Sequence, residues 1–200
     1  GLQARYSSES APGVDSSGYA RHGTAWGSTL TAVNDVTTNG VGLNFPAGSI
    51  IIVPMDETLR GMANYTVATW VKVASVTGGG TVSTFFTTRM NNGNEPYQIM
   101  LRIVDGKLFF MASSPSGGWP VDYRFTSTLS VQSNVWVHTA VAVTSTGIKL
   151  YVNGQPAGSW TKSGILFCPP DRPVNEMGFG IGHPYLKTAT VGEFSGQLDD

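Results

Sequence analysis

The segment from Ser133 to Gly158 constrains the fold of this chain more than any other. Between positions 135 and 143, valines and one threonine occupy the odd positions, and Trp136, His138 and two alanines occupy the even ones. A period of two with many β-branched residues is typical of an extended strand and carries no helical repeat. Since both sides are largely apolar, we expect this strand to be buried on both faces.

The second half of the segment predicts two further strands. A turn at Ser145–Gly147 precedes Ile148–Val152, which again alternates with a period of two. Asn153-Gly154 then provides the strongest short signal for a hairpin, because both residues readily adopt positive φ. The segment therefore predicts a meander of three antiparallel strands.

The rest of the chain reads as shorter strands separated by turns. Tyr65–Val73 is a second long strand, and we assign its central Trp70 to the core together with Trp136. Val41–Phe45 and Ser49–Val53 are expected to form a hairpin around Pro46–Gly48. The other expected strands are Gly1–Tyr6, Thr81–Thr88, Tyr97–Val104, Lys107–Ala112, Val121–Phe125, Met177–Gly182 and Val191–Leu198.

Length and composition favour one all-β domain spanning residues 1–200. A chain of 200 residues with 25 glycines and 11 prolines suits short strands and frequent turns. We find no internal repeat, no linker and no apolar run of membrane length, and so expect no membrane insertion. Cys168 is the single cysteine, which excludes a disulfide within the chain, and its neighbours indicate a packed thiol.

The charge of the chain argues against nucleic acid as a partner. Only 12% of residues are charged and the net charge is −1. Nonspecific binding to nucleic acid, or to an anionic membrane surface, depends on a field of lysine and arginine that this composition does not provide.

The loop from Ser7 to Gly27 holds the first candidate for a metal site. Asp15, followed by two serines and Gly18, forms an oxygen-rich turn of the kind that can surround calcium. The same pattern is also typical of an Asx-turn, in which the carboxylate binds its own backbone. The spacing alone favours the Asx-turn.

Several motifs together resemble the laminin-G-like jelly-roll domains of the concanavalin-A-like lectin/glucanase superfamily. They occur in the family's order over nearly the whole chain. They are VDSSGYARHGTAWG, TVATWVKV, NVWVHTAVAVTSTGIKLYVNGQPAG, MGFGIGHPY and FSGQLDD. The resemblance implies a sandwich of two antiparallel sheets, one of them curved, with binding loops at an edge or on the concave face.

The resemblance also implies a calcium ion. In such domains an aspartate in the first loop lies against acidic residues near the end, and a structural calcium joins them. The matching residues are Asp15, Asp199 and Asp200. Alternatively, the last two aspartates cap turns or pair with Arg21.

The family pattern continues past its acidic pair with an apolar closing strand, whereas this sequence ends at Asp200. We therefore expect one sheet to lack a strand and to leave backbone groups unpaired. The rest of a larger protein, or a separate chain, would fill the gap.

The sequence does not favour an enzyme. Glucanases of this superfamily carry their carboxylates on one strand with alternate spacing, so that the side chains flank the glycosidic bond. Asp56 and Glu57 are adjacent and would face opposite sides, and the other carboxylates stand alone. The three histidines show no zinc-type spacing, and His138 is expected to be structural.

We therefore predict a noncatalytic recognition module with a carbohydrate as ligand. Sugars bind to exposed aromatic rings that stack on their C–H faces and to planar polar groups that bridge hydroxyls. The candidates are Trp119, Tyr97, Trp160 and Tyr185, with Arg89, Asn91, Asn92 and Asn94 as polar partners. Each aromatic ring could instead cover the sandwich.

Two other functions remain open. Low charge and many threonine, glycine and serine residues also suit a structural or adhesive domain of an assembly such as a virion appendage, with a protein surface as partner. An atypical glycoside hydrolase is the weaker alternative. In the first two cases we expect an extracellular, cell-surface or virion-surface location.

Overall fold

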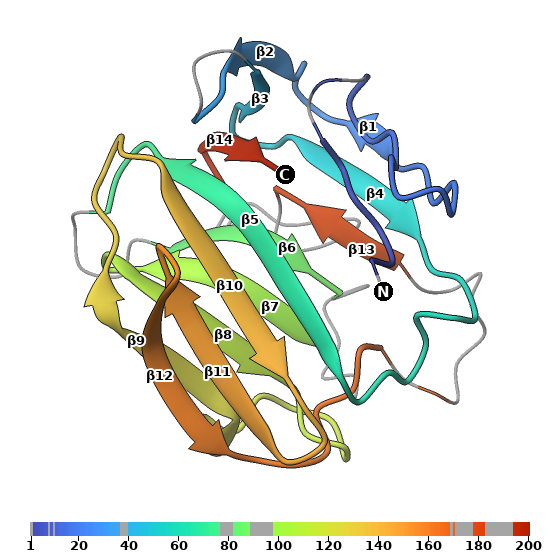
Figure 1. Cartoon of the computed structure of the whole chain (residues 1–200), viewed down its shortest axis with the longest axis vertical. Coiled ribbons are helices and arrows are strands. Elements are labelled where there is room, and N and C mark those ends of the chain that lie inside the picture. Colours follow the sequence, from blue (N-terminus) through green and yellow to red (C-terminus); the bar gives the residue numbers. More distant parts are fainter. Residues whose placement is uncertain are drawn as a thin grey trace.

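The computed structural model describes residues 2–7, 9, 11–36, 40–76, 82–88, 98–168, 170, 178–182 and 194–200. In these residues two antiparallel sheets of seven strands each pack face to face, as Figure 1 shows. The predicted all-β sandwich is therefore confirmed. None of the helical residues in the described part forms a segment long and apolar enough to cross a membrane.

The front sheet has the strand order β12-β11-β10-β5-β14-β3-β2 and lies toward the viewer in Figure 1. Its long central strand, β5, pairs with β10 on one side and with the short β14 on the other. The strands are β2 (Thr31–Asn34), β3 (Val41–Phe45), β5 (Tyr65–Val73), β10 (Val137–Val143), β11 (Gly147–Val152), β12 (Gln155–Thr161) and β14 (Gly196–Asp199).

The back sheet has the order β1-β4-β13-β6-β7-β8-β9. Its strands are β1 (Thr24–Trp26), β4 (Ile50–Pro54), β6 (Val82–Thr87), β7 (Ile99–Val104), β8 (Lys107–Ala112), β9 (Arg124–Ser130) and β13 (Gly178–Ile181). A single 3₁₀ turn, η1 (Val121–Tyr123), precedes β9 in the described residues.

The predicted meander is confirmed. Strands β10, β11 and β12 are consecutive antiparallel neighbours at one side of the front sheet. The turn between β11 and β12 has φ of 50° at Asn153 and 74° at Gly154, the positive values that an Asn-Gly hairpin requires. Asp105 and Gly106 join β7 to β8 in the same way.

The prediction that β10 is buried on both faces is wrong. Val137, Val141 and Val143 are buried against the back sheet, but His138 and Ala142 on the other side are only partly buried. Val135, before the strand begins, is 45% exposed. On the side of His138 and Ala142 only Ala140 is buried.

Other differences follow from tertiary packing. The two strands around Pro46–Gly48 are not a hairpin, because β3 belongs to the front sheet and β4 to the back sheet. Residues 2–7 form no strand, and Val121–Tyr123 is a 3₁₀ turn rather than the start of a strand. Strands β1 and β2 lie where the sequence predicted none.

The core lies between the sheets and is rich in aromatic rings. Phe194 connects the two layers: its ring is 6.0 Å from that of Phe45 in the front sheet and 6.4 Å from that of Phe85 in the back sheet. All three side chains are at most 1% exposed. This cluster fixes the end of the chain against both sheets.

We predict that Phe194→Ala destabilises the domain strongly. The substitution removes a fully buried ring and leaves a cavity between the sheets, which typically lowers the free energy of unfolding by about 3–5 kcal/mol. Urea unfolding followed by tryptophan fluorescence measures the loss. Lys149→Ala, at an exposed position of β11, is the control and should change the free energy by less than about 0.5 kcal/mol.

Candidate functional site

The outer face of the front sheet carries a group of partly exposed rings that we call the aromatic face: Trp70, Trp136, His138 and Tyr151. The alternation of side chains along each strand places these rings on the outer face. In β5 the side chains of Val71 and Val73 point into the core, so Trp70 points outward. In Figure 1 no described segment crosses in front of β5, β10 and β11.

The rings of the aromatic face are held by contacts among neighbouring strands. Trp70 and His138 are direct cross-strand partners, and their ring centroids lie 5.2 Å apart at an interplanar angle of 66°. The Lys72 ammonium lies 6.0 Å from the centroid of Trp136. The same indole lies over Gly42, where a Cβ would be 3.4 Å from two ring carbons.

Polar side chains lie beside these rings in register. Gln197 of β14 is directly opposite Asn44 of β3 and Lys72 of β5, so the three form one row across the outer face. The backbone N–H of His138 donates to Oδ1 of Asn153 at 2.9 Å. Planar amides beside aromatic rings can hydrogen-bond hydroxyl groups while the rings stack on an apolar surface.

Two of the predicted ligand residues lie away from this face. Trp119 is half-buried before η1, and its carbonyl accepts a hydrogen bond from Nη2 of Arg124 at 2.8 Å. Trp160 is not in a loop but in β12, where its ring packs 5.3 Å from that of Phe125 and covers the core. Tyr97, Arg89, Asn91, Asn92, Asn94 and Tyr185 lie outside the described residues.

The assignment of Trp70 and Trp136 to the core is wrong. Both are only partly buried, and both lie on the outer side of the front sheet. The sequence of β5 does contain a signal for the outward position of Trp70. Trp70 lies on the same side of the strand as Lys72, and on the opposite side from the buried Val71 and Val73.

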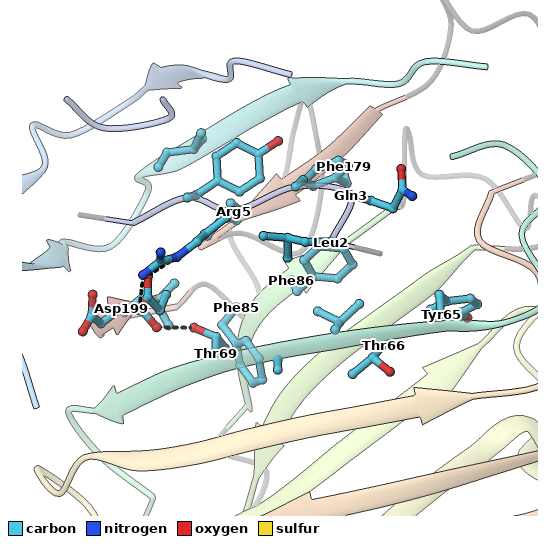
Figure 2. Close-up of a pocket in the computed structure, with 18 of the residues that line it drawn as sticks. Leu2, Gln3, Arg5, Tyr65, Thr66, Thr69, Phe85, Phe86, Phe179 and Asp199 are labelled. Carbon is cyan, nitrogen blue, oxygen red and sulfur yellow. Dashed lines mark hydrogen bonds and ion pairs between the residues drawn. The ribbon is translucent and has the colours of Figure 1, made fainter. Parts of the chain in front are cut away.

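A second feature is a groove between the sheets, beside the first half of β5 (Figure 2). It has a volume of about 720 Å³ and is lined mainly by apolar side chains. Residues Leu2–Tyr6, which we call the N-terminal segment, form the wall opposite β5. The labelled lining residues include Tyr65, Phe85, Phe86 and Phe179.

Asp15 organises the loop beneath the N-terminal segment. Its carboxylate accepts hydrogen bonds from the backbone N–H groups of Arg5, Ser17 and Arg21 and from the Ser17 hydroxyl, at 2.8–3.0 Å. Burial alone would raise the pKa of Asp15, but these hydrogen bonds outweigh it and lower the pKa to about 2. The bonds to Ser17 are those of an Asx-turn.

Arg5 connects this loop to the last residues of the chain. Its N–H binds Asp15, and its guanidinium donates two hydrogen bonds to the Asp200 carboxylate at 2.9 and 3.1 Å. Next to this pair, burial raises the pKa of Asp199 to about 6, with the negative charges of Asp200 and Asp35 adding to the rise. Arg21 pairs with Asp56 rather than with the last two aspartates.

These partners do not fit a calcium ion shared by Asp15 and Asp200. N–H and O–H donors surround the first carboxylate, and a guanidinium holds the second. Among the described residues no group of three or more histidine, cysteine or acidic side chains is arranged to hold a metal ion. Calcium binding therefore stays a prediction with a direct test.

Two further carboxylates of the described residues are held in ion pairs. Asp56 and Asp122 lie on separate parts of the molecule, paired with Arg21 and Lys162. His22 accepts a hydrogen bond from the Asp15 backbone, and His138 belongs to the aromatic face.

Comparisons with known proteins agree with this architecture. The sequence profile of a laminin G family, described as the Concanavalin A-like lectin/glucanases superfamily, matches residues 47–200. The chain therefore belongs to this superfamily, as the sequence motifs predicted, and its two sheets form a jelly roll of that type. The comparison with curated proteins found no match.

Solved structures with the same fold include several binding domains. Domain 4 of AbnA, a GH43 extracellular arabinanase from Geobacillus stearothermophilus in complex with arabinotriose, has 21% identity and a TM-score of 0.71, covering 99% of this chain and 89% of that one. The binding domain of Paraclostridial Mosquitocidal Protein 1 has 18% identity and a TM-score of 0.68, covering 98% of this chain and 47% of that one.

A third structure is the CBM40 of the Ruminococcus gnavus IT-sialidase, bound to α2,3-sialyllactose. It has 14% identity and a TM-score of 0.59, covering 79% of this chain and 85% of that one. At these identities the likeness shows the fold alone. The chain spans about half the length of the mosquitocidal-protein domain.

We predict that Asp15 makes stability depend on pH in the acid range. Because its pKa is about 2 in the folded protein and near 4 when unfolded, its contribution is fully present above pH 4 and is lost as pH falls toward 2. The loss is about 2 kcal/mol. Urea unfolding between pH 2 and 5 should show a smaller decrease for Asp15→Asn, which is already destabilised at pH 7.

Calcium is tested by thermal unfolding with and without a chelator. If the ion joins Asp15 to the last two aspartates, adding EDTA should lower the Tm by several degrees, and calcium should restore it. Asp199→Asn should remove this response. An unchanged Tm in EDTA would show that Arg5, not a cation, holds the two ends together.

Proposed function

We propose that the chain is a noncatalytic carbohydrate-binding module. The observation that carries this proposal is the aromatic face, where rings on adjacent strands are partly open to solvent beside a row of amide and ammonium groups. Sugars combine apolar C–H faces with hydroxyl groups, so this combination matches their chemistry.

The residues of the aromatic face have distinct roles in the proposal. Trp70 and Tyr151 supply surfaces on which a sugar ring stacks, and Gln197 and Asn44 bind hydroxyl groups as donors and acceptors. Lys72 adds a donor beside Trp136. These groups sit on regular strands rather than in loops, so little conformational entropy is lost when the ligand binds.

The comparisons support a binding role without specifying the ligand. Two of the similar domains are described in complex with arabinotriose and with α2,3-sialyllactose, and a third is described as the binding domain of a mosquitocidal protein. The arabinanase is described as extracellular, which supports our proposal of an extracellular or surface location.

A role in a larger assembly is the second candidate function, and the groove beside β5 favours it. An apolar groove of about 720 Å³ lies along Tyr65–Thr69 of β5, which pairs only with β10 among the described strands. Such a groove suits contact with another polypeptide better than contact with a sugar. The two functions use different surfaces and can coexist.

We predict that Trp70→Ala weakens glycan binding by about tenfold or more. Removing the stacking ring should make the binding free energy less favourable by about 1.4 kcal/mol or more, which corresponds to that loss of affinity. A glycan array identifies the ligand, and calorimetry with that ligand measures the affinity of each variant.

The matched control is Trp26→Ala. This side chain is 61% exposed but lies on β1 of the back sheet, away from the aromatic face, so affinity should not change. Loss of binding in Trp119→Ala but not in Trp70→Ala would move the site to the loop before η1. Absence of any glycan ligand would contradict the proposal.

A further inference from the structure

Four neighbouring strands contribute a row of polar side chains to the outer face of the front sheet. Thr31 of β2 lies opposite Asn44 of β3, Asn44 opposite Gln197 of β14, and Gln197 opposite Lys72 of β5. Strands in a sheet are about 4.8 Å apart, so the row is about 14 Å long and exceeds the width of one sugar ring. Within the part of the chain that the structure describes, the side chains of Asn44, Gln197 and Lys72 make no hydrogen bond to another residue. These groups are therefore available to a ligand.

Trp136 lies at the end of this row. Val137 begins β10 opposite Val71, which puts the preceding residue, Trp136, level with the row. The Asn134 N–H donates to the Val73 carbonyl at 2.8 Å and so ties the turn before β10 to the end of β5. This turn fixes the backbone from which the indole projects.

Gly42 gives the indole its place on the sheet. A Cβ at this position would lie 3.4 Å from Cζ2 and Cη2 of Trp136, and 3.4 Å from the carbonyl oxygen of Leu198. The ring therefore packs against the backbone of β3, where a longer side chain would occupy the same space. Since Gly42 is buried and Trp136 is partly exposed, part of the indole rests on the sheet and part remains open for stacking.

Lys72 brings a positive charge to this indole. Its ammonium is 6.0 Å from the ring centroid, at the outer limit of a cation–π contact, so the ring satisfies little of its charge. Among the described residues Lys72 is in no ion pair. Asp199, the one carboxylate that the described strands direct to this outer face, is buried and lies in the next row opposite Trp70. A ligand at Trp136 therefore meets an ammonium group and no exposed carboxylate of these strands.

We propose that Trp136, Lys72 and Gln197 form a subsite for a sugar that carries a carboxylate group. The sugar ring stacks on the indole, the Lys72 ammonium donates a charge-assisted hydrogen bond to one carboxylate oxygen, and the Gln197 amide donates to the other. Gly42 is a positioning residue, because it acts through Trp136. This inference rests on the proposed carbohydrate-binding function and specifies the class of glycan.

An acidic sugar fits this subsite better than a neutral one does. A neutral sugar that covers Trp136 would displace water from Lys72 without supplying a negative charge, and removing a charge from water without a partner is costly. A carboxylate replaces the lost water with an opposite charge at hydrogen-bond distance.

The surrounding charges favour one isolated carboxylate over a densely sulfated chain. Lys72 is the only cation of the row, and the negative charges of Asp199, Asp200 and Asp35 lie together at the end of β14. A sulfated polymer would bring several charges close to these aspartates, and like charges repel. A single carboxylate at Lys72, continued by neutral sugars along the amides of the row, avoids this repulsion.

A glycan array of matched pairs tests the subsite in the full chain. Each carboxylate-bearing oligosaccharide is printed beside its methyl ester, which has the same shape but no charge. The set includes xylotetraose carrying one glucuronic acid, trigalacturonic acid, neutral xylotetraose, and a carrageenan tetrasaccharide that has sulfate but no carboxylate. The tightest ligand should carry a carboxylate and should bind about tenfold or more tightly than its ester.

Calorimetry with the best pair then measures the role of Lys72. Lys72→Met should reduce the affinity for the acid to that for the ester and leave the ester unchanged, whereas Lys72→Arg should retain most of the difference. Raising NaCl from about 0.05 to 0.5 M should weaken binding of the acid more than binding of the ester.

The control variant for the charge is Lys149→Met, which should change neither affinity. Lys149 is on the same outer face but is level with Thr66, about 20 Å along the strands from Lys72.

Two substitutions at Gly42 test the seat of the indole. Gly42→Val should weaken the acid and the ester by the same factor, because it displaces Trp136 and leaves Lys72 in place. Gly42→Ala, whose Cβ would make only ordinary contact with the ring, should bind like the unmodified chain. Trp136→Ala should reproduce the loss seen in Gly42→Val, and Tm measurements show whether each variant is folded.

The outcomes separate this inference from the function on which it rests. A neutral or sulfated oligosaccharide as the tightest ligand, or an equal loss of acid and ester in Lys72→Met, would overturn the acidic-sugar subsite and leave the carbohydrate-binding function in place. Binding of no oligosaccharide on the array would overturn both.

Discussion

The packing of one side of β5 and β10 against the back sheet is the interaction on which the rest of the structure depends. Val71, Val73, Val137 and Val141 point inward and are at most 4% exposed. Because side chains alternate along a strand, burying this set forces the opposite set outward. The position of Trp70 and His138 on the aromatic face is a direct consequence, and a shift of one residue would bury both.

The same strand also links the two proposed binding surfaces. Its outer side holds Trp70 and Lys72 in register with residues of β10 and β14, and its residues Tyr65–Thr69 line one wall of the groove. The surfaces are chemically different: one combines rings with polar side chains, the other is lined mainly by apolar side chains. A sugar suits the first and a polypeptide suits the second.

The N-terminal segment holds the groove open because hydrogen bonds fix it from outside. Asp15 binds the Arg5 backbone, and the Arg5 side chain binds Asp200, so these hydrogen bonds join residues far apart in sequence. The buried Asp15 carboxylate has enough donors to keep its charge, which explains its lowered pKa. Burial raises the pKa of Asp199, and the negative charges of Asp200 and Asp35 add to the rise.

The sequence by itself determined the fold class, the meander and most strands, because alternation, Asn-Gly and Asp-Gly turns and β-branched residues act over a few neighbouring positions. It also determined that no alternating pair of carboxylates is present. Only the tertiary structure decided that Trp136 lies outside the core, that β3 and β4 belong to different sheets, and that Arg5 meets Asp200. Each of these depends on which layer covers a strand, or on contacts between residues distant in sequence, and local patterns do not specify either.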